Sequence, residues 1–362
     1  MKKIILFLII SICFCSNAFS ENLTVTDITG RQVSVPNNPE KIICIGPGTL
    51  RLISYLNAQD KLAGIEEMEK IRPEGRPYRI ANPNFTKLPS IGPGGPAAIN
   101  KKPDMEAVLK VAPDIIFASY LAPLKADEIE KSLNIPIVII SYGISSTFDE
   151  TVYKSITLIG KILNKQTRAS EIIHYIEAAR KDLQKRASNI SDNKKPSVYP
   201  CGIGYRGARG IESSEKNYIP LKWINAKNIS EKIPNFKQSH VILNKKKLLL
   251  LNPDIIFIDG GGKTLIEQDI LKKTNYYKGL KAFRNKKAYI LFPFNLYITN
   301  IGTALANAYT AGKILYPKEF NDIDPEKKTD KIYTFLTGKP VYKDMKKRYG
   351  KIGQTYKMPQ GE

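Results

Sequence analysis

The sequence has few of the residues from which metal cages and catalytic triads are built. Its 362 residues include two histidines, four cysteines and one tryptophan. His174 and His240 stand far apart, and the cysteines lack the clustered spacings of zinc sites. This scarcity argues against an all-protein metal site. No Ser-His-Asp, Cys-His or paired-carboxylate pattern supports an enzyme either, so an exported two-lobed hydrolase is only a distant alternative.

Acidic residues are also scarce compared with basic ones. The chain carries 56 Lys and Arg against 34 Asp and Glu, a formal net charge of +22. This surplus favours an anionic partner, such as nucleic acid, anionic lipid or an acidic ligand. The alternative is that the lysines lie on solvated faces and only aid solubility. Hydrophobic residues at 42% and charged residues at 25% are ordinary for a globular protein and exclude a disordered or fibrous one.

Long apolar runs are absent except at the N-terminus. Lys2 and Lys3 precede an almost uninterrupted apolar stretch over 4–15, and small residues follow before Glu21. This pattern predicts a secretory signal peptide over 1–20, which is too short to span a membrane. The mature chain would keep a formal charge of +20 after losing the two lysines. We therefore expect a soluble periplasmic protein and no cytosolic role with nucleic acid.

The cysteines do not predict a disulfide. Cys13 and Cys15 lie in the signal peptide after bulky residues, so plain cleavage is favoured over a lipid anchor. Cys44 and Cys201 lie in apolar, strand-like runs. An exported protein permits a disulfide, but buried free thiols are the preferred interpretation.

A nine-residue motif occurs twice in the sequence. The stretch 109–117, Leu-Lys-Val-Ala-Pro-Asp-Ile-Ile-Phe, recurs over 249–257 as Leu-Leu-Leu-Asn-Pro-Asp-Ile-Ile-Phe. In both copies a helical stretch ends at proline and a buried strand follows. Short Ile/Val runs that alternate with helical periods predict parallel sheets covered by helices. The sequence therefore predicts an α/β protein with two similar lobes.

The lobes are predicted to be joined by helix. Apolar residues recur at helical spacing over 148–190, and no Gly/Ser-rich linker interrupts them. We expect a signal peptide over 1–20, an N-terminal lobe over 21–147, a bridging helix over 148–190 and a C-terminal lobe over 194–362. The basic tail after Pro317 is expected to wrap around the outside. A helical connection suits a rigid clamp better than a flexible hinge.

The order of these elements resembles a known family. A hairpin over 26–36, a strand and loop over 41–48, both Pro-Asp-Ile-Ile-Phe strands and the bridging helix resemble the periplasmic substrate-binding proteins of iron-siderophore and cobalamin ABC importers. Within it the chain looks closest to nickel- or iron-chelate binders of the enterochelin-uptake type. That closer match is carried by Arg76-Pro-Tyr78, Tyr205-Arg206-Gly207, His240 and Gly338-Lys-Pro-Val-Tyr342.

This resemblance implies a fold, a function and partners. The fold would be two Rossmann-like lobes joined by a single long helix. The function would be to capture a metal chelate, such as a ferric siderophore or similar iron complex, without catalysis. Delivery would be to the permease and ATPase of an ABC importer, with the binding protein acting as a monomer. Nickel or cobalt chelates, haem and cobalamin are alternatives on the same fold.

The ligand is expected between the lobes. Ligands bind outside the carboxyl ends of parallel strands, and those ends converge where two such lobes face each other. The loops there are rich in Arg and Tyr and poor in carboxylates, which favours an anionic chelate over a bare cation. Arg51 could instead only cap the helix that follows it. The candidate ligand-binding residues are Arg51, Arg76, Tyr78, Tyr120, Tyr205, Arg206, Arg209 and Tyr297.

The resemblance also implies metal-contacting and docking residues. His240 and Tyr297 match positions where relatives complete the coordination of a metal, and Glu106 matches an acid that docks on the permease. Lys246 stands where the second docking acid is expected, which puts symmetric docking in doubt. Tyr120 and Gly260 stand where siderophore binders often carry arginine, which favours a small chelate over a bulky tris-catecholate.

Overall fold

Each lobe is built on a four-stranded parallel sheet. The computed structural model describes residues 22–71, 73–143, 148–205, 207–234 and 239–358, so the predicted signal peptide and Arg206 lie outside the described residues. The N-terminal sheet has the order β4-β3-β5-β6 and the C-terminal sheet the order β12-β11-β7-β9, and all neighbours pair in parallel. Their strands are β3 (Ile42–Ile45), β4 (Leu62–Ile65), β5 (Ile115–Ser119), β6 (Ile137–Ile140), β7 (Ser197–Cys201), β9 (Lys227–Asn228), β11 (Ile255–Asp259) and β12 (Ala288–Leu291). The prediction of two parallel α/β lobes is confirmed.

Two small antiparallel sheets complete the strands. The predicted N-terminal hairpin is present as β1 (Leu23–Thr26) and β2 (Gln32–Val35), which turn through Gly30 at φ 91°. Strands β8 (Ser213–Glu215) and β10 (His240–Ile242) pair on the C-terminal lobe. The second sheet matters for the site because it positions His240 opposite Glu215.

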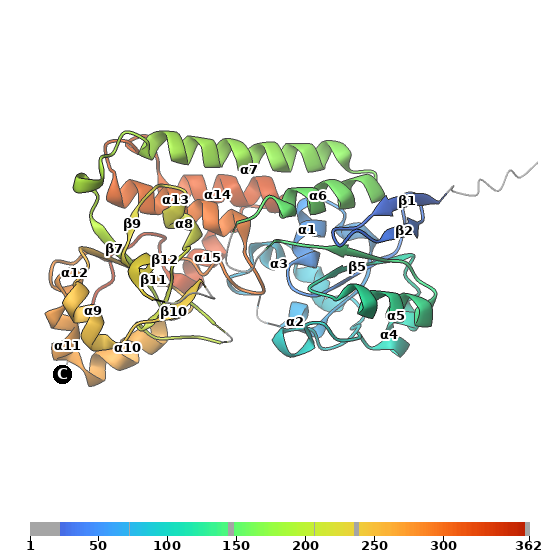
Figure 1. Cartoon of the computed structure of the whole chain (residues 1–362), viewed down its shortest axis with the longest axis horizontal. Coiled ribbons are helices and arrows are strands. Elements are labelled where there is room, and N and C mark those ends of the chain that lie inside the picture. Colours follow the sequence, from blue (N-terminus) through green and yellow to red (C-terminus); the bar gives the residue numbers. More distant parts are fainter. Residues whose placement is uncertain (1–21, 72, 144–147, 206, 235–238, 359–362) are drawn as a thin grey trace, which may run out of the picture.

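Helices flank the sheets and join the lobes (Figure 1). Those up to the bridge are α1 (Thr49–Tyr55), α2 (Glu67–Lys70), α3 (Pro77–Ala81), α4 (Met105–Val111) and α5 (Pro123–Leu133). Those after it are α8 (Ile219–Lys222), α9 (Lys245–Leu251), α10 (Lys263–Lys272), α11 (Thr274–Gly279), α12 (Lys281–Arg284), α13 (Ile301–Leu315), α14 (Pro325–Thr337) and α15 (Tyr342–Tyr349). None of the helices in the described ranges is long and apolar enough to cross a bilayer.

The repeated Pro-Asp motif has a structural explanation. Asp114 accepts the backbone N–H groups of Glu40 and Lys41, both at 2.8 Å, just before β3 begins. Asp254 accepts the N–H of Ser197 at 2.7 Å where β7 begins. Each aspartate therefore fixes the start of the neighbouring strand. The two copies of the motif have the same structural role in the two lobes.

The bridge over 148–190 is two helices where one was expected. Helix α6 (Thr151–Ile162) ends near Leu163, and α7 (Gln166–Ala187) begins after a short reversal. Gly160 permits this reversal, because a Cβ atom there would lie 2.7 Å from the Cβ of Ala169. Of these two helices, only α7 runs across both lobes (Figure 1).

The expectation that the segment after Pro317 wraps around the outside is wrong for α14, which contacts both lobes. The stretch that follows α15 does run along β12, the edge strand of the C-terminal sheet, where the N–H of Ile290 donates to the carbonyl of Gln354 at 3.0 Å. Helix α14 packs beneath α7 and contacts α13 of the C-terminal lobe as well as α1 and α3 of the N-terminal lobe (Figure 1). The ring of Tyr175 on α7 stacks on that of Phe335 at 4.0 Å. The apolar face formed by Ile332 and Leu336 explains this position, because it must be buried.

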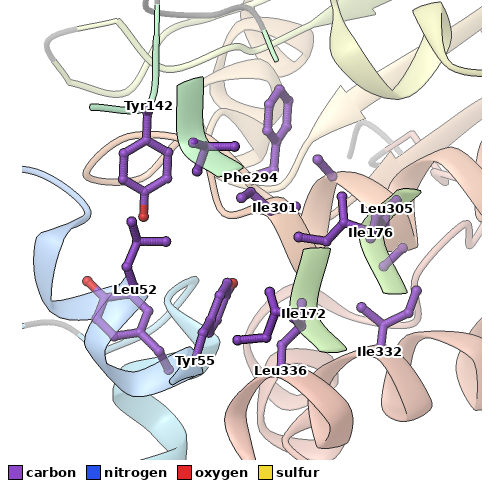
Figure 2. Packing of buried hydrophobic residues seen from close by; sticks show 14 of the residues in the cluster. Leu52, Tyr55, Tyr142, Ile172, Ile176, Phe294, Ile301, Leu305, Ile332 and Leu336 are labelled. Carbon is purple, nitrogen blue, oxygen red and sulfur yellow. The ribbon is translucent and has the colours of Figure 1, made fainter. Parts of the chain in front are cut away.

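One hydrophobic core runs through both lobes. Figure 2 shows Leu52 and Tyr55 of α1 beside Ile172 of α7 and Leu336 of α14, with Ile301 of α13 behind them. All are buried. A shared core of this kind ties the lobes together and limits how far they can separate. Cys44 and Cys201 are buried free thiols, as predicted, and burial raises the pKa of both well above the usual value.

Candidate ligand-binding cleft

The loop that follows β12 crosses from the C-terminal lobe to the N-terminal lobe. Its Tyr297 hydroxyl donates to a carboxylate oxygen of Glu66 at 2.6 Å and accepts the N–H of Gly95 at 3.0 Å. The other oxygen of Glu66 accepts the N–H of Gly46 at 3.0 Å. Glu66 follows β4 and Gly46 follows β3, so Tyr297 is held at the carboxyl edge of the N-terminal sheet. The contact ties the loop after β12 to the N-terminal lobe.

Arg51 of α1 also holds the loop after β12 in place. Its guanidinium donates to the carbonyls of Leu296, Tyr297 and Thr299 at 3.0, 2.9 and 2.9 Å. Ile298 has φ 63°, a conformation that a β-branched residue adopts only when its surroundings impose it. Arg51 is completely buried and its terminal nitrogens bind these carbonyls, so the expectation that it contacts a ligand is corrected to a structural role.

Arg76 and Tyr78 are buried around one carboxylate, which also corrects their expected role. Glu69 on α2 forms an ion pair with Arg76 at 3.0 Å and accepts the hydroxyl of Tyr78 at 2.7 Å. Arg79 donates to the backbone carbonyl of Glu69. All four side chains are almost inaccessible to solvent. The segment 67–82 folds inward because one acid and two arginines satisfy each other there, and these side chains therefore face no ligand.

On the C-terminal lobe, two of the predicted site residues form an aromatic pair. The rings of Tyr205 and His240 are stacked at 4.3 Å and are nearly parallel. Ser213 donates to the carbonyl of Ile203 at 2.5 Å and contacts Nε2 of His240 at 2.8 Å. Because its single hydrogen is used on Ile203, the serine must accept from His240, which places a proton on Nε2. Tyr205 and His240 are thus brought together as a rigid pair.

Arg209 lies beside this pair and remains exposed. Its Nε donates to the carbonyl of Tyr205 at 3.1 Å. Burial and the nearby cation of Arg209 lower the pKa of His240, which keeps the imidazole neutral at neutral pH. A neutral imidazole, a phenol and an exposed guanidinium therefore lie next to one another on the C-terminal lobe. Tyr297, the second predicted metal contact, is bonded instead to Glu66 of the other lobe.

Tyr120 lies directly after β5 on the N-terminal lobe, where the repeat places Gly260 on the C-terminal lobe. It follows β5 with φ 55°, and its hydroxyl is buried with no hydrogen-bond partner in the described part of the chain. Burial raises its pKa to about 12. Nearby, a cavity of about 20 Å³ lies at the ends of β3 and β5 and is lined by Gly92, Asn100 and Lys101. That space holds a water molecule or a small ion only.

A larger groove lies where no sequence pattern predicted one. It measures about 650 Å³ and lies between the segment 73–86 and helix α15. Arg79, Ile80, Asp344 and Arg348 are among the residues that line it. Within the described ranges, no three His, Cys, Asp or Glu side chains come together in a way that could hold a metal ion.

Two buried acidic residues at strand ends were not among the site residues predicted from the sequence. Glu66 and Asp259 both stand at the carboxyl end of a strand, the position that served as the signal for the other candidates. Burial is the main cause that raises the pKa of each to about 7. Asp259 retains one backbone bond, from the N–H of Gly261 at 2.8 Å. Both carboxyl groups therefore titrate close to neutral pH.

This titration predicts a loss of stability as the pH rises. The pKa of each group is higher in the folded chain than in the unfolded chain, so the folded state binds more protons between about pH 4 and pH 7. The stabilisation is complete at a pH below the pKa values of the two groups in the unfolded chain, and it is lost as the pH rises past about 7. We expect the free energy of unfolding in urea to decline by up to about 3–4 kcal/mol for each group over this range.

Matched variants separate the two contributions. Glu66→Gln and Asp259→Asn should each flatten part of the decline, whereas Glu106→Gln, on the exposed face of α4, should leave it unchanged. A wild-type free energy of unfolding that stays constant over this pH range would contradict the prediction.

Comparison with known proteins identifies the family. The sequence model of the Periplasmic binding protein family matches residues 42–293. The chain therefore belongs to this family of substrate-binding transport proteins, which are not enzymes, and the resemblance found in the sequence is confirmed. Its two-lobed fold is that of the class III periplasmic binding proteins.

Three relatives illustrate the similarity. The molybdate-binding protein MolA of Haemophilus influenzae is 22% identical over 331 residues, covering 85% of this chain and 89% of MolA. The structure of MolA with bound molybdate superposes on this chain with a TM-score of 0.68. The petrobactin-binding protein YclQ of Bacillus subtilis is 22% identical, covering 79% of this chain and 86% of YclQ, with a TM-score of 0.57. Helicobacter pylori CeuE with bound Ni(II) is 18% identical, covers 87% and 96% of the two chains, and gives a TM-score of 0.63.

Proposed function

We propose that this protein captures an anionic metal chelate outside the cytoplasm and delivers it to an ABC importer. The stacked Tyr205–His240 pair beside the exposed Arg209 is the observation that carries this proposal. Aromatic faces suit the rings of catecholate-like chelators, and arginine donors suit their charged oxygens. A ferric siderophore or a similar iron complex is the preferred ligand, and the relatives that bind petrobactin and nickel support this class.

His240 is proposed to complete the coordination of an unsaturated chelate. Its ring stands on β10 at the edge of the cleft, and the low pKa favours the neutral imidazole that metals bind. Tyr297 could join it only after leaving Glu66, so this second contact requires the cleft to open. Arg206, next to Tyr205 in sequence, is proposed as a further anion contact.

A small oxyanion is the second candidate ligand. The cavity at the ends of β3 and β5 is lined by backbone of Gly92 and Gly94 and by Asn100, Lys101 and Lys102. Its size and basic rim suit an ion such as the molybdate that MolA binds. The carboxyl group of Glu66 also lines it and would oppose an anion unless it is protonated.

Export and docking complete the proposal. We propose that residues 1–20 direct the chain to the periplasm, where it acts as a monomer. Glu106 is exposed near the start of α4 and is proposed to contact the permease.

Calorimetry with preformed chelates tests the function. Wild-type protein should bind a ferric chelate at micromolar concentrations or below, and free Fe³⁺, Ni²⁺ or molybdate much more weakly. Arg209→Ala should weaken chelate binding by about 1.5–3 kcal/mol, because a charge-assisted hydrogen bond is lost. His240→Ala should weaken only chelates that leave metal positions open.

Arg284→Ala is the matched control, because Arg284 is an exposed arginine on α12. It should bind like the wild type. Tight binding of molybdate with no binding of chelates would favour the second candidate, and equal affinity of all variants for every chelate would remove the Tyr205–His240 pair from the site.

A further inference from the structure

Helices α9, α10 and α11 form one continuous surface at the end of the C-terminal lobe, which we call the basic end (Figure 1). Lys245 of α9 forms an ion pair with Asp269 of α10, and its ammonium lies 5.7 Å from the ring centre of Tyr276 on α11. A Cβ atom on Gly279 of α11 would lie 3.1 Å from the side chain of Leu249. Helix α9 is therefore packed against both α10 and α11.

The exposed residues of α9 and α10 include both lysines and leucines. Lys246, Lys247 and Leu250 are exposed on α9 and share one face of the helix, because residues three and four apart are neighbours. The exposed fraction of Leu250 is 85%, and that of Leu271 at the end of α10 is 60%. Lys246 and Lys247 form no ion pair within the described ranges, unlike Lys245.

The equivalent part of the N-terminal lobe has the opposite charge balance. From α9 to the start of β12, residues 245–287 contain eleven Lys and Arg against four Asp and Glu. From α4 to the start of β6, residues 105–136 contain three against five. The repeat places Lys246 where the other lobe has Glu106. The basic end is therefore a property of one lobe and does not follow from the fold that both lobes share.

We infer that the basic end binds the surface of an anionic lipid membrane. Lysines beside a negatively charged leaflet each contribute favourable electrostatic free energy, and exposed leucines can enter the boundary between headgroups and acyl chains. The inference goes beyond ligand capture. A carrier that rests on the membrane stays close to any importer within it.

The composition favours lipid over an acidic protein partner. Protein interfaces are depleted in lysine, and their hot spots are rich in Trp, Tyr and Arg and poor in leucine. Of the eleven basic residues over 245–287, ten are lysines and one, Arg284 on α12, is an exposed arginine. Helices α9 and α10 themselves present Lys246, Lys247, Leu250 and Leu271, with no exposed arginine or aromatic ring. Lysine carries a mobile, strongly hydrated point charge, which suits a fluid array of headgroups better than a fixed carboxylate.

Vesicle flotation with the mature full-length chain tests the inference. The protein should float with vesicles made of equal parts phosphatidylglycerol and phosphatidylcholine, and not with phosphatidylcholine alone. The double variant Lys246→Gln, Lys247→Gln should lower the partition coefficient at least about tenfold, since each lysine near the surface contributes on the order of 1 kcal/mol. Leu250→Ser should lower it several-fold, and this loss should persist in high salt.

The repeat supplies the matched controls. Leu109→Ser and Lys110→Gln change exposed residues of α4, the equivalent helix, and should leave flotation unchanged. Thermal unfolding confirms that each variant is folded. Equal flotation with both vesicle types would overturn the inference, as would equal losses from the α4 and α9 variants. Absence of flotation with anionic vesicles, combined with capture by a detergent-solubilised permease through Lys246, would overturn it in favour of a protein partner.

Discussion

Arg51→Ala is expected to lower the free energy of unfolding by about 3 kcal/mol or more. The substitution removes a buried guanidinium that binds the carbonyls of Leu296, Tyr297 and Thr299, and hydrogen bonds to charged groups each contribute about 1.5–3 kcal/mol. It also leaves the buried carbonyl of Thr299 without the donor that Arg51 supplies, whereas the carbonyl of Leu296 keeps the side-chain amide of Asn300 at 3.1 Å. Urea denaturation followed by circular dichroism would measure the loss.

Two further variants test whether the hydrogen bonds of Arg51 cause this loss of stability. Arg51→Lys keeps the charge but cannot reach three carbonyls from one planar group, so it should recover only part of the loss. Arg209→Ala changes an exposed arginine and should alter the free energy of unfolding by no more than about 0.5 kcal/mol. If Arg51→Ala proves as stable as Arg209→Ala, the loop after β12 is held by other contacts.

Glu69→Ala is expected to destabilise the N-terminal lobe by about 3–5 kcal/mol. The carboxylate is the common partner of Arg76 and Tyr78, and its removal leaves a buried guanidinium without its counterion. The same denaturation experiment measures the change. Trypsin should also cut the segment 67–82 faster in this variant, because its arginines become accessible as the segment opens.

Glu67→Ala provides the comparison on the same short helix. Its side chain is half exposed and forms only a surface ion pair with Lys70 at 3.5 Å. Such pairs contribute about 0–1 kcal/mol. Similar losses from both variants would mean that Glu69 acts through helix α2 and not through the buried arginines.

Much of the fold could be predicted because its signals are local. The apolar runs at 115–119 and 255–259 are short, are flanked by Pro-Asp, and repeat with helices between them. These features depend on neighbours in sequence, so they predicted two parallel lobes and the N-terminal hairpin. The break between α6 and α7 was missed because the apolar spacing continues at Leu163, where the chain already reverses.

The orientation of the candidate side chains could not be predicted from the sequence, and the expected position of the ligand between the lobes stays a prediction. Tyr205 and His240 are separated by a long stretch of sequence, yet they stack because β8 and β10 pair and position His240 at the cleft. Sequence reasoning selected both residues separately. Only pairing between distant strands made them a unit.

The class of the protein, with its two repeated parallel α/β lobes, could be derived from the amino-acid sequence, because apolar runs and their repeats are local features. Tertiary structure alone decided which charged groups remain available to a ligand. Arg51 and Arg209 look alike in sequence, but Arg51 finds three carbonyls about 245 residues further along the chain, whereas Arg209 stays in solvent. A buried guanidinium must be satisfied wherever partners exist, and those partners become known only when the lobes pack together.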